Sequence, residues 1–329
     1  MDPDHSDGAS GAFFYDAEGR DHALDMRNLD KLPKTGPEQL IWFDIDRSDT
    51  AAIARVGEML ALSPETIEAM GSGDAVPRLA SYEKYFHFSL TRADVQEKPV
   101  INFAVCERWL LTVRDGEVPY FTAYRERDRG ESLIGRLSPL MLAGSLIDWH
   151  FEGYQEAVAT MQRDLDRLDS AILGRRRARP PLSDLARMRL NVARLRRRLD
   201  GHRPLVHALL RPDFPRVSEE KQGEYFSVLE NHFLGAADNV ERMRESVIGS
   251  FDLYATRTAQ ETNDLVRLLT LVTVATGLAA AIAGIFGMNF EVPFFKWGEV
   301  GFAITLVMMV GVALALFIIA WRRGWLSPT

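Results

Sequence analysis

The chain has 329 residues, of which 47% are hydrophobic and 26% are charged, and its formal net charge is −7. That length accommodates a sizeable soluble domain and a smaller module. The acidic balance argues against a general nucleic-acid binder, which needs a basic surface. Cys106 is the one cysteine, which excludes an intrachain disulfide and a cysteine-based metal cluster. The first ten residues are acidic and small, so no signal peptide is expected.

The N-terminal part, from about Phe13 to Val118, alternates short apolar runs with one helical stretch. Its strand-like runs cover residues 40–43, 85–88, 101–105 and 109–113. Between the first two lies a helical stretch at residues 51–70, in which Ser63 precedes Pro64 as a helix cap precedes the first helical position. Strands mixed with helices predict an α/β domain over residues 1–136. His87, among aromatic residues on a strand, is expected to be structural.

From about Leu137 the sequence changes to a helical pattern. Apolar residues recur every three or four positions over residues 154–173, and a second helix is predicted over residues 183–210. The basic run Arg175–Arg179 between them is expected to be a solvated tip rather than a binding site for nucleic acid or lipid. Ser218 is a candidate N-cap for a third helix. We therefore predict a helical bundle with a stalk over residues 137–267.

The third helix is unusually long, because no proline occurs between Ser218 and Pro293. Some seventy helical residues would extend on the order of 100 Å. Such a helix, amphipathic in its first half, needs neighbouring helices for stability. The sequence therefore predicts a bundle or a symmetric oligomer.

Two uncharged runs close the chain, at residues 268–290 and 300–321. Each is long enough to cross about 30 Å of hydrocarbon as a helix. Arginines flank the pair on one side, at Arg257, Arg267 and Arg322–Arg323, and the intervening loop is acidic. The positive-inside rule then predicts a two-span inner-membrane domain at residues 268–326, with both termini cytoplasmic and the loop outside.

The end of the first span carries Gly287-Met288-Asn289, followed by Phe290-Glu291. Together with the Ile282–Phe286 run before it, the short acidic loop, and the basic-Trp-Leu terminus at residues 322–326, this triplet resembles the signature of the CorA family of divalent-cation channels. Glu261–Asp264, Pro77–Leu79 and Ile41–Asp44 are similar to further pieces of that family.

The resemblance implies a funnel-shaped homopentamer in the lipid bilayer that takes up Mg²⁺, with Co²⁺ or Ni²⁺ as accidental passengers, through one central pore. No resident cofactor is implied, since the divalent cation is the cargo. Gly287, Met288 and Asn289 would form the selectivity ring, with Asn289 bound to the metal through its hydration waters, because Mg²⁺ keeps its waters strongly. A helix C-cap is the structural alternative for Asn289.

Helical spacing inward from Asn289 gives a candidate pore face: Asn263, Val266, Leu269, Thr273, Gly277, Ala280 and Gly284. Glu291 and Glu299 could gather cations at the mouth, although a plain solvated loop explains them as well. Gly277 and Ala280 replace a bulky gate residue and a hydroxyl of the family pattern, and Val228 stands where regulated members carry an acid. Gate position and closure by cytoplasmic Mg²⁺ are therefore open.

Two other functions remain open. A zinc transporter of the ZntB type, with or without proton coupling, shares the architecture, but zinc favours His, Cys and carboxylate ligands and the candidate pore offers neither His nor Cys. A non-conducting membrane-anchored scaffold or sensor is the alternative of another class. The sequence contains no phosphate-binding glycine loop and no credible nucleophile arrangement, so it is not expected to be an enzyme.

Overall fold

A computed structural model describes residues 10–26, 36, 39–73, 77–93, 100–127, 134–174, 182–211, 214, 220–288 and 298–323. The chain forms two compact units, one from Met1–Leu168 with Pro180–Ile248 and one from Asp169–Arg179 with Gly249–Thr329. The three-part division predicted at residues 136 and 267 remains a prediction. The predicted cap Ser218, the basic run 175–179 and the terminal residues 324–329 lie outside the described residues.

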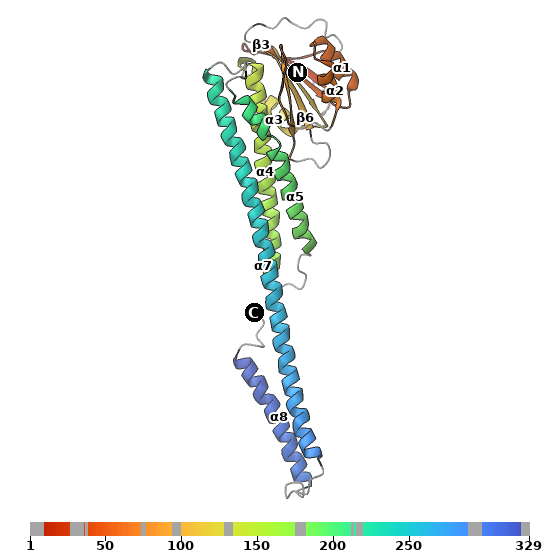
Figure 1. Ribbon diagram of the computed structural model, residues 1–329, viewed down its shortest axis with the longest axis vertical. Helices are drawn as coiled ribbons and strands as arrows, with labels where there is room; N and C mark the ends of the chain where they lie inside the picture. Colours follow the sequence, from red (N-terminus) through yellow and green to blue (C-terminus); the bar gives the residue numbers. More distant parts are fainter. Residues whose placement is uncertain are drawn as a thin grey trace. The chain divides into compact units, whose positions relative to one another are not determined.

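The first unit is built on one mixed sheet with the strand order β2-β1-β3-β7-β6-β5-β4 (Figure 1). Within this described sheet β3 and β7 pair in parallel, and the other neighbouring strands pair antiparallel. The predicted strand runs fall on β3, β5, β6 and β7, with Tyr85 just before β5, which confirms the α/β class. The strands are β1 Gly11–Asp16, β2 His22–Leu24, β3 Gln39–Asp46, β4 Ala80–Ser81, β5 Phe86–Thr91, β6 Val100–Val105 and β7 Trp109–Arg114.

Helices α1 (Thr50–Met59) and α2 (Pro64–Gly71) cover one face of this sheet through Ile53, Val56 and Met70. The predicted stretch 51–70 is thus divided into two helices. The division follows from a turn in which Ala61 has a φ of 52°. Ser63 then accepts a hydrogen bond from the Thr66 amide, which confirms the cap before Pro64.

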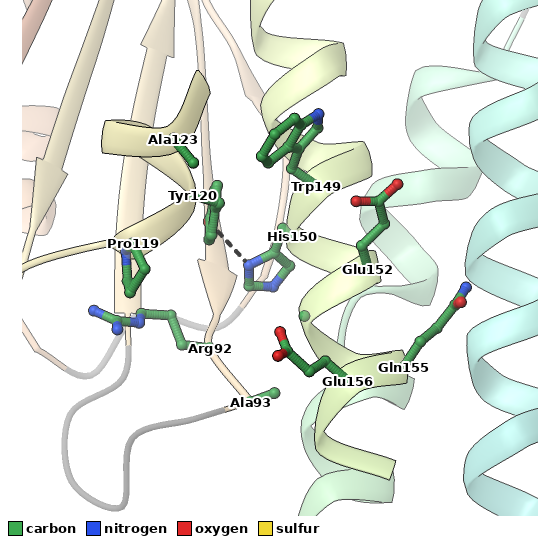
Figure 2. A pocket seen from close by; sticks show the side chains of 11 residues that line it. Arg92, Ala93, Pro119, Tyr120, Ala123, Trp149, His150, Glu152, Gln155 and Glu156 are labelled. Carbon is green, nitrogen blue, oxygen red and sulfur yellow. Dashed lines mark hydrogen bonds between the residues drawn. The ribbon is translucent and has the colours of Figure 1, made fainter. Parts of the chain in front are cut away.

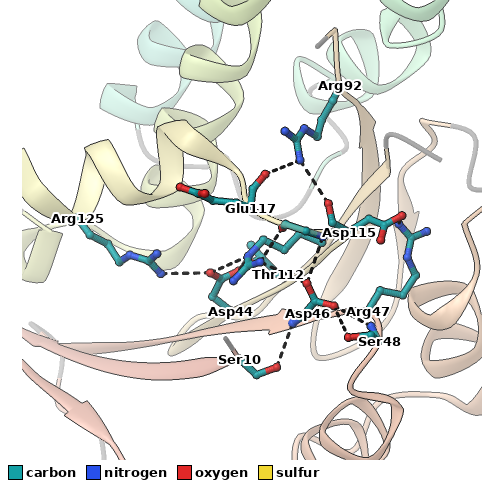
Figure 3. Close-up of polar contacts among 12 residues, drawn as sticks. Ser10, Asp44, Asp46, Arg47, Ser48, Arg92, Thr112, Asp115, Glu117 and Arg125 are labelled. Carbon is teal, nitrogen blue, oxygen red and sulfur yellow. Dashed lines mark hydrogen bonds and ion pairs between the residues drawn. The ribbon is translucent and has the colours of Figure 1, made fainter. Parts of the chain in front are cut away.

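The opposite face carries an aromatic core and a buried ion-pair network. Trp42 on β3 meets Phe121 edge-on, with ring centroids 5.3 Å apart, so α3 (Pro119–Arg127) is held against the sheet. Beside it, Asp44 is 1% exposed and accepts hydrogen bonds from Arg114, Arg125 and Thr112 (Figure 3). Two guanidinium groups and a hydroxyl compensate the desolvation of this carboxylate.

A short 3₁₀ turn, Ile134–Arg136, leads into the helices of the first unit: α4 (Pro139–Leu173), α5 (Leu182–Asp200), α6 (Arg203–Leu209) and the start of α7. α4 begins well before Tyr154, where the clear periodicity starts. The predicted helix 183–210 is interrupted at Gly201–His202. His202 is buried there and its Nε2 accepts a hydrogen bond from the Thr91 amide, which joins the helices to the end of β5.

His87 is buried on β5, as expected of a structural residue. Burial lowers the pKa of His87, so its imidazole is neutral at physiological pH. Among the described residues, no group of three or more His, Cys, Asp or Glu side chains is arranged to hold a metal ion.

The second unit contains the rest of α7 (Glu220–Gly287, 68 residues in all) and α8 (Glu299–Arg322). The single long helix predicted from the absence of proline is therefore present. In this unit the Ser250 hydroxyl on α7 donates a hydrogen bond of 2.9 Å to Asp169 on α4, which ties the end of α4 to the long helix.

Candidate ion pathway

The C-terminal third of α7 and all of α8 expose large apolar side chains. Both helices are long and apolar enough to cross a membrane, and their most apolar stretches are not buried within the chain. Leu269 is 66% exposed and Phe302 is 72% exposed. Such surfaces on adjacent helices are stable in lipid or against further helices rather than in water.

Exposure along α7 is periodic and marks two different faces. The residues with reduced exposure recur at three- and four-residue spacing: Leu271, Ala275, Ala279, Ile282 and Phe286. α8 shows the same spacing in the residues that lose exposure, which are Gly301, Thr305, Met309, Val312, Leu316 and Ala320. α8 returns along α7 in Figure 1, so these periodic faces are where the two helices meet. Several of these residues are small, which allows close helix approach in a membrane.

The predicted pore positions lie on the other face of α7. Asn263, Val266, Leu269, Thr273, Gly277, Ala280 and Gly284 are all exposed. With about 100° per residue, the centre of this set is about 175° around the helix from the centre of the α8-facing set. α8 thus backs α7 on one side and leaves the predicted pore face uncovered.

Thr273 has a side-chain hydroxyl on this face of α7. Its Oγ1 donates to the backbone carbonyl of Leu269 at 2.8 Å, and Thr270 makes the same bond to Val266. The hydroxyl proton is therefore used within the helix, and the free lone pairs of Oγ1 remain as acceptors. Acceptors suit a hydrated cation, because the water molecules around the ion direct their hydrogens outward.

The predicted selectivity triplet begins where α7 ends. Gly287 is the last helical residue, and the Met288 amide donates to the Ile285 carbonyl at 3.3 Å. Met288 is 50% exposed. Asn289 and Glu291 lie outside the described residues.

Glu299 is exposed in the first turn of α8. A carboxylate there is stabilised by the positive end of the helix dipole. This gives Glu299 a structural reason to be acidic in addition to the predicted role at the mouth.

Asn263 stands among charged residues at the other end of the apolar stretch. Arg257 pairs with Glu261 at 3.9 Å, and Arg267 pairs with Asp264 at 3.4 Å. These are i,i+3 and i,i+4 pairs near the surface, which contribute little stability. The members of these pairs are the last charged residues of α7 before its uncharged segment begins.

Comparison with known proteins matches this arrangement. A family model described as CorA-like Mg2+ transporter protein matches residues 37–322. The chain belongs to the CorA-like Mg²⁺ transporter family. The match extends from just before β3 to the last residue of α8. It therefore includes most of the first unit, which contains the sheet and is called the sheet unit, and the two apolar helices.

Individual CorA relatives are distant in sequence. The chain is 25% identical to the cobalt/magnesium transport protein CorA of Thermotoga maritima over 285 residues, covering 84% of this chain and 80% of that protein. It is 26% identical to the magnesium transport protein CorA of Haemophilus ducreyi over 326 residues, covering 93% and 99%.

The fold also matches a solved CorA structure. The complete CorA magnesium transporter from Methanocaldococcus jannaschii superposes with a TM-score of 0.75 at 18% identity, covering 96% of this chain and 98% of that one. The CorA-like fold, with an N-terminal α/β unit, a long helix and two C-terminal apolar helices, is thereby confirmed.

The residues of α7 and α8 that face each other are the part of the apolar helix pair that sequence reasoning missed. The signal for them was present, because Ala275 and Ala279 on α7, and Gly301 and Thr305 on α8, repeat at the four-residue spacing of close helix packing. This signal was hidden by the many other small residues in both spans.

Val228, 48% exposed on α7, carries no charge at the position expected of a regulatory acid.

Proposed function

We propose that this protein is a homopentameric channel for divalent cations that carries Mg²⁺ into the cell, with Co²⁺ and Ni²⁺ as occasional passengers. The observation that carries the proposal is the arrangement of the two faces of α7. One face packs on α8, and the opposite face, which bears the predicted pore positions, is exposed. Five copies placed with these faces inward would line a central pore and keep α8 outside.

The chemistry of this face suits an ion that keeps its water. Between Leu268 and Gly287 no side chain is charged, so nothing would trap a divalent cation tightly. Thr273 offers a hydroxyl acceptor to the hydration shell, and Val266 and Leu269 form an apolar stretch able to gate by losing water. At the outer end, a ring of Asn289 amides would hold the hydrated ion, with Glu291 and Glu299 concentrating cations.

The test is uptake of Mg²⁺ into liposomes that contain the purified protein, followed with an enclosed fluorescent indicator. We expect the wild-type protein to admit Mg²⁺ and Asn289→Ala to abolish entry. Asn231→Ala, which changes an exposed residue of α7 far along the helix from the apolar segment, is the matched control and should leave uptake unchanged. Light scattering in detergent should give the mass of a pentamer for all three proteins.

The same vesicles separate the other functions. Zn²⁺ entry without Mg²⁺ entry, particularly if a proton gradient drives it, would make the protein a ZntB-type zinc transporter. Absence of both fluxes in protein shown to be an intact oligomer would favour a non-conducting scaffold or sensor.

Orientation is testable with the native cysteine. Arg257 and Arg267 on α7 and Arg322–Arg323 at the end of α8 favour placement of both termini in the cytoplasm of an inner-membrane protein. Cys106 is partly exposed in the sheet unit. A membrane-impermeant maleimide should therefore label Cys106 only after spheroplasts are opened, whereas Glu299→Cys in a Cys106→Ser background should be labelled from outside. Labelling of Cys106 in intact spheroplasts would contradict this orientation and place the sheet-containing unit outside the cytoplasm.

A further inference from the structure

A pocket of about 620 Å³ lies in the sheet unit between α3, α4 and the residues that follow β5 (Figure 2). Its size is within the range of small-molecule sites. Three aromatic side chains line it, Tyr120 from α3 and Trp149 and His150 from α4. None of its lining residues belongs to the candidate ion pathway, and the proposed transport function gives the pocket no task.

Two carboxylates stand at the edge of this pocket. Glu152 and Glu156 are exposed and four residues apart, so α4 presents them on the same side. Within the part of the chain that the structure describes, neither the Glu152 nor the Glu156 carboxylate forms an ion pair. Neither of these two negative charges is therefore paired directly with a cationic side chain of the described residues.

Arg92 is the one arginine or lysine among the described residues that line the pocket, and its guanidinium is hydrogen-bonded to the backbone. It is 5% exposed, and its Nη1 donates hydrogen bonds to the backbone carbonyls of Glu117 at 2.8 Å and Asp115 at 3.4 Å (Figure 3). These bonds hold the guanidinium at the turn between β7 and α3. Arg92 is thus a fixed part of the wall rather than a free partner for an anion.

His150 provides a second, independent observation that points to a ligand at this wall. The side chain is 2% exposed, and its Nδ1 lies 3.2 Å from the Tyr120 hydroxyl. Its Nε2 is buried and has no hydrogen-bond partner among the described residues. In Figure 2 the Nε2 side of the ring is turned toward the end of the pocket where Glu156 stands. A buried polar atom of this kind is normally satisfied by a ligand or an ordered water.

His150 also adds no positive charge. Burial lowers the pKa of His150 well below its ordinary value, the neighbouring His202 lowers it further, and the Thr91 backbone opposes these two larger effects. The imidazole is therefore neutral at physiological pH. With Tyr120 donating or accepting at Nδ1, Nε2 can take the complementary hydrogen-bonding role.

We propose that this pocket binds a small organic cation of the primary alkylammonium or diammonium class. The ammonium group would lie between Glu152 and Glu156, and the alkyl stem would lie along Tyr120 and Trp149, whose rings also attract cations. An ordered water brought in with the ligand would satisfy Nε2 of His150. Inorganic anions are disfavoured by the two carboxylates. A bare metal ion is disfavoured because no group of three metal-binding side chains occurs among the described residues.

The test is calorimetric titration of the full-length protein, in detergent micelles, with 1,4-diaminobutane as the probe. We expect saturable binding at constant ionic strength and no binding of 1,4-butanediol, which has nearly the same shape without charge. Glu152→Gln/Glu156→Gln should weaken the binding of the diamine about ten-fold. Trp149→Ala should weaken it as well by removing an aromatic wall.

The matched control is Asp164→Asn/Asp166→Asn, which removes two exposed carboxylates from the same helix outside the pocket. This variant should bind the diamine as the wild type does, and thermal unfolding should show that all variants are folded. Absence of saturable binding to the wild type would overturn the proposal. So would equal weakening by the two double variants, or binding of the diol as tight as that of the diamine.

Discussion

The imidazole rings of His150 and His202 lie in contact inside the sheet unit, with ring centroids 5.2 Å apart. His150 is 2% exposed and His202 is 0% exposed. His202 bridges the Thr91 amide and the Leu199 carbonyl, so the pair connects the end of β5 with α4 and with the α5–α6 junction. Two buried imidazoles in contact cannot both be charged at low cost, which couples the folding of this region to pH.

The first prediction is that the sheet unit loses stability as the pH falls from about 6.5 to 4. Burial lowers the pKa of His202 from 6.5 to about 4, whereas in the unfolded chain the ordinary value is restored. Between these pH values the unfolded chain binds more protons, so acid favours unfolding. One group with a pKa lowered by this much reduces the free energy of unfolding by about 3 kcal/mol once the pH has fallen below about 4, relative to neutral pH.

Thermal unfolding of the detergent-solubilised protein between pH 7.5 and 4.5 measures this effect. His202→Asn, which keeps an acceptor for the Thr91 amide, should flatten the acid dependence. His207→Asn, on the exposed side of α6, should retain the wild-type dependence. An equally steep profile in His202→Asn would show that the acid sensitivity arises elsewhere.

The second prediction concerns the buried carboxylate Asp44. Asp44→Asn removes the charge that faces Arg114 and Arg125. The Arg114 side chain, 4% exposed, then keeps the Gly116 carbonyl and the more distant carboxylate of Asp46 at 3.6 Å. Removing one partner of a buried network costs about 3–5 kcal/mol. We expect the midpoint of thermal unfolding to fall by about 10 °C.

Asp164→Asn is the control for Asp44→Asn, because Asp164 pairs with Arg167 on the exposed side of α4. Its midpoint should change by no more than about 1–2 °C. If the two variants unfold at similar temperatures, the Asp44 network does not hold the sheet and α3 together as described.

The third prediction rests on the open space around Gly277. Apart from its own helix backbone and chain neighbours, a Cβ at Gly277 meets no atom of the described residues within 4 Å, and the same holds for a Cβ at Gly311 on α8. Leucine at either position should therefore leave the fold of the single chain intact. In the proposed pore, however, Gly277→Leu would place five bulky side chains around the axis and lower Mg²⁺ flux about ten-fold or more.

Gly311→Leu should transport normally, since Gly311 is exposed on α8, which would be the outer helix of the proposed pore. Liposome flux and the oligomer mass should be measured for both variants. Normal Mg²⁺ flux through Gly277→Leu would show that Gly277 does not line the pore.

The fourth prediction concerns the hydroxyl of Thr273. Thr273→Val removes an acceptor from the proposed pore while keeping the shape of the side chain and costing only the local bond to Leu269. Mg²⁺ flux should fall several-fold, because hydration waters lose a partner. Thr305→Val on α8 removes the equivalent bond to Gly301 on the face toward α7, and its flux should stay near that of the wild type. If Mg²⁺ flux falls equally in Thr273→Val and Thr305→Val, the loss comes from the broken hydrogen bond within the helix and not from the pore lining.

The class of the fold and the two apolar spans could be predicted from the amino-acid sequence alone. Periodic apolar residues, the cap at Ser63–Pro64 and the absence of proline after Ser218 are local signals, and they act within one element. The uncharged spans are recognisable because the bilayer fixes their length and composition. The resemblance carried by Gly287-Met288-Asn289 and the residues around it named the family that the family match then confirmed.

The three-dimensional arrangement alone shows which side of each helix or strand packs against another element. The predicted helices are divided at Ala61 and at His202, where a positive φ and a long-range bond to Thr91 interrupt them. Asp44 meets Arg114 and Arg125, which are 70 and 81 residues away in the chain. The face of α7 that meets α8 also emerged only there. These features depend on contacts between elements distant in sequence, and local patterns do not identify the partner of such a contact, even where small residues repeat along α7 and α8.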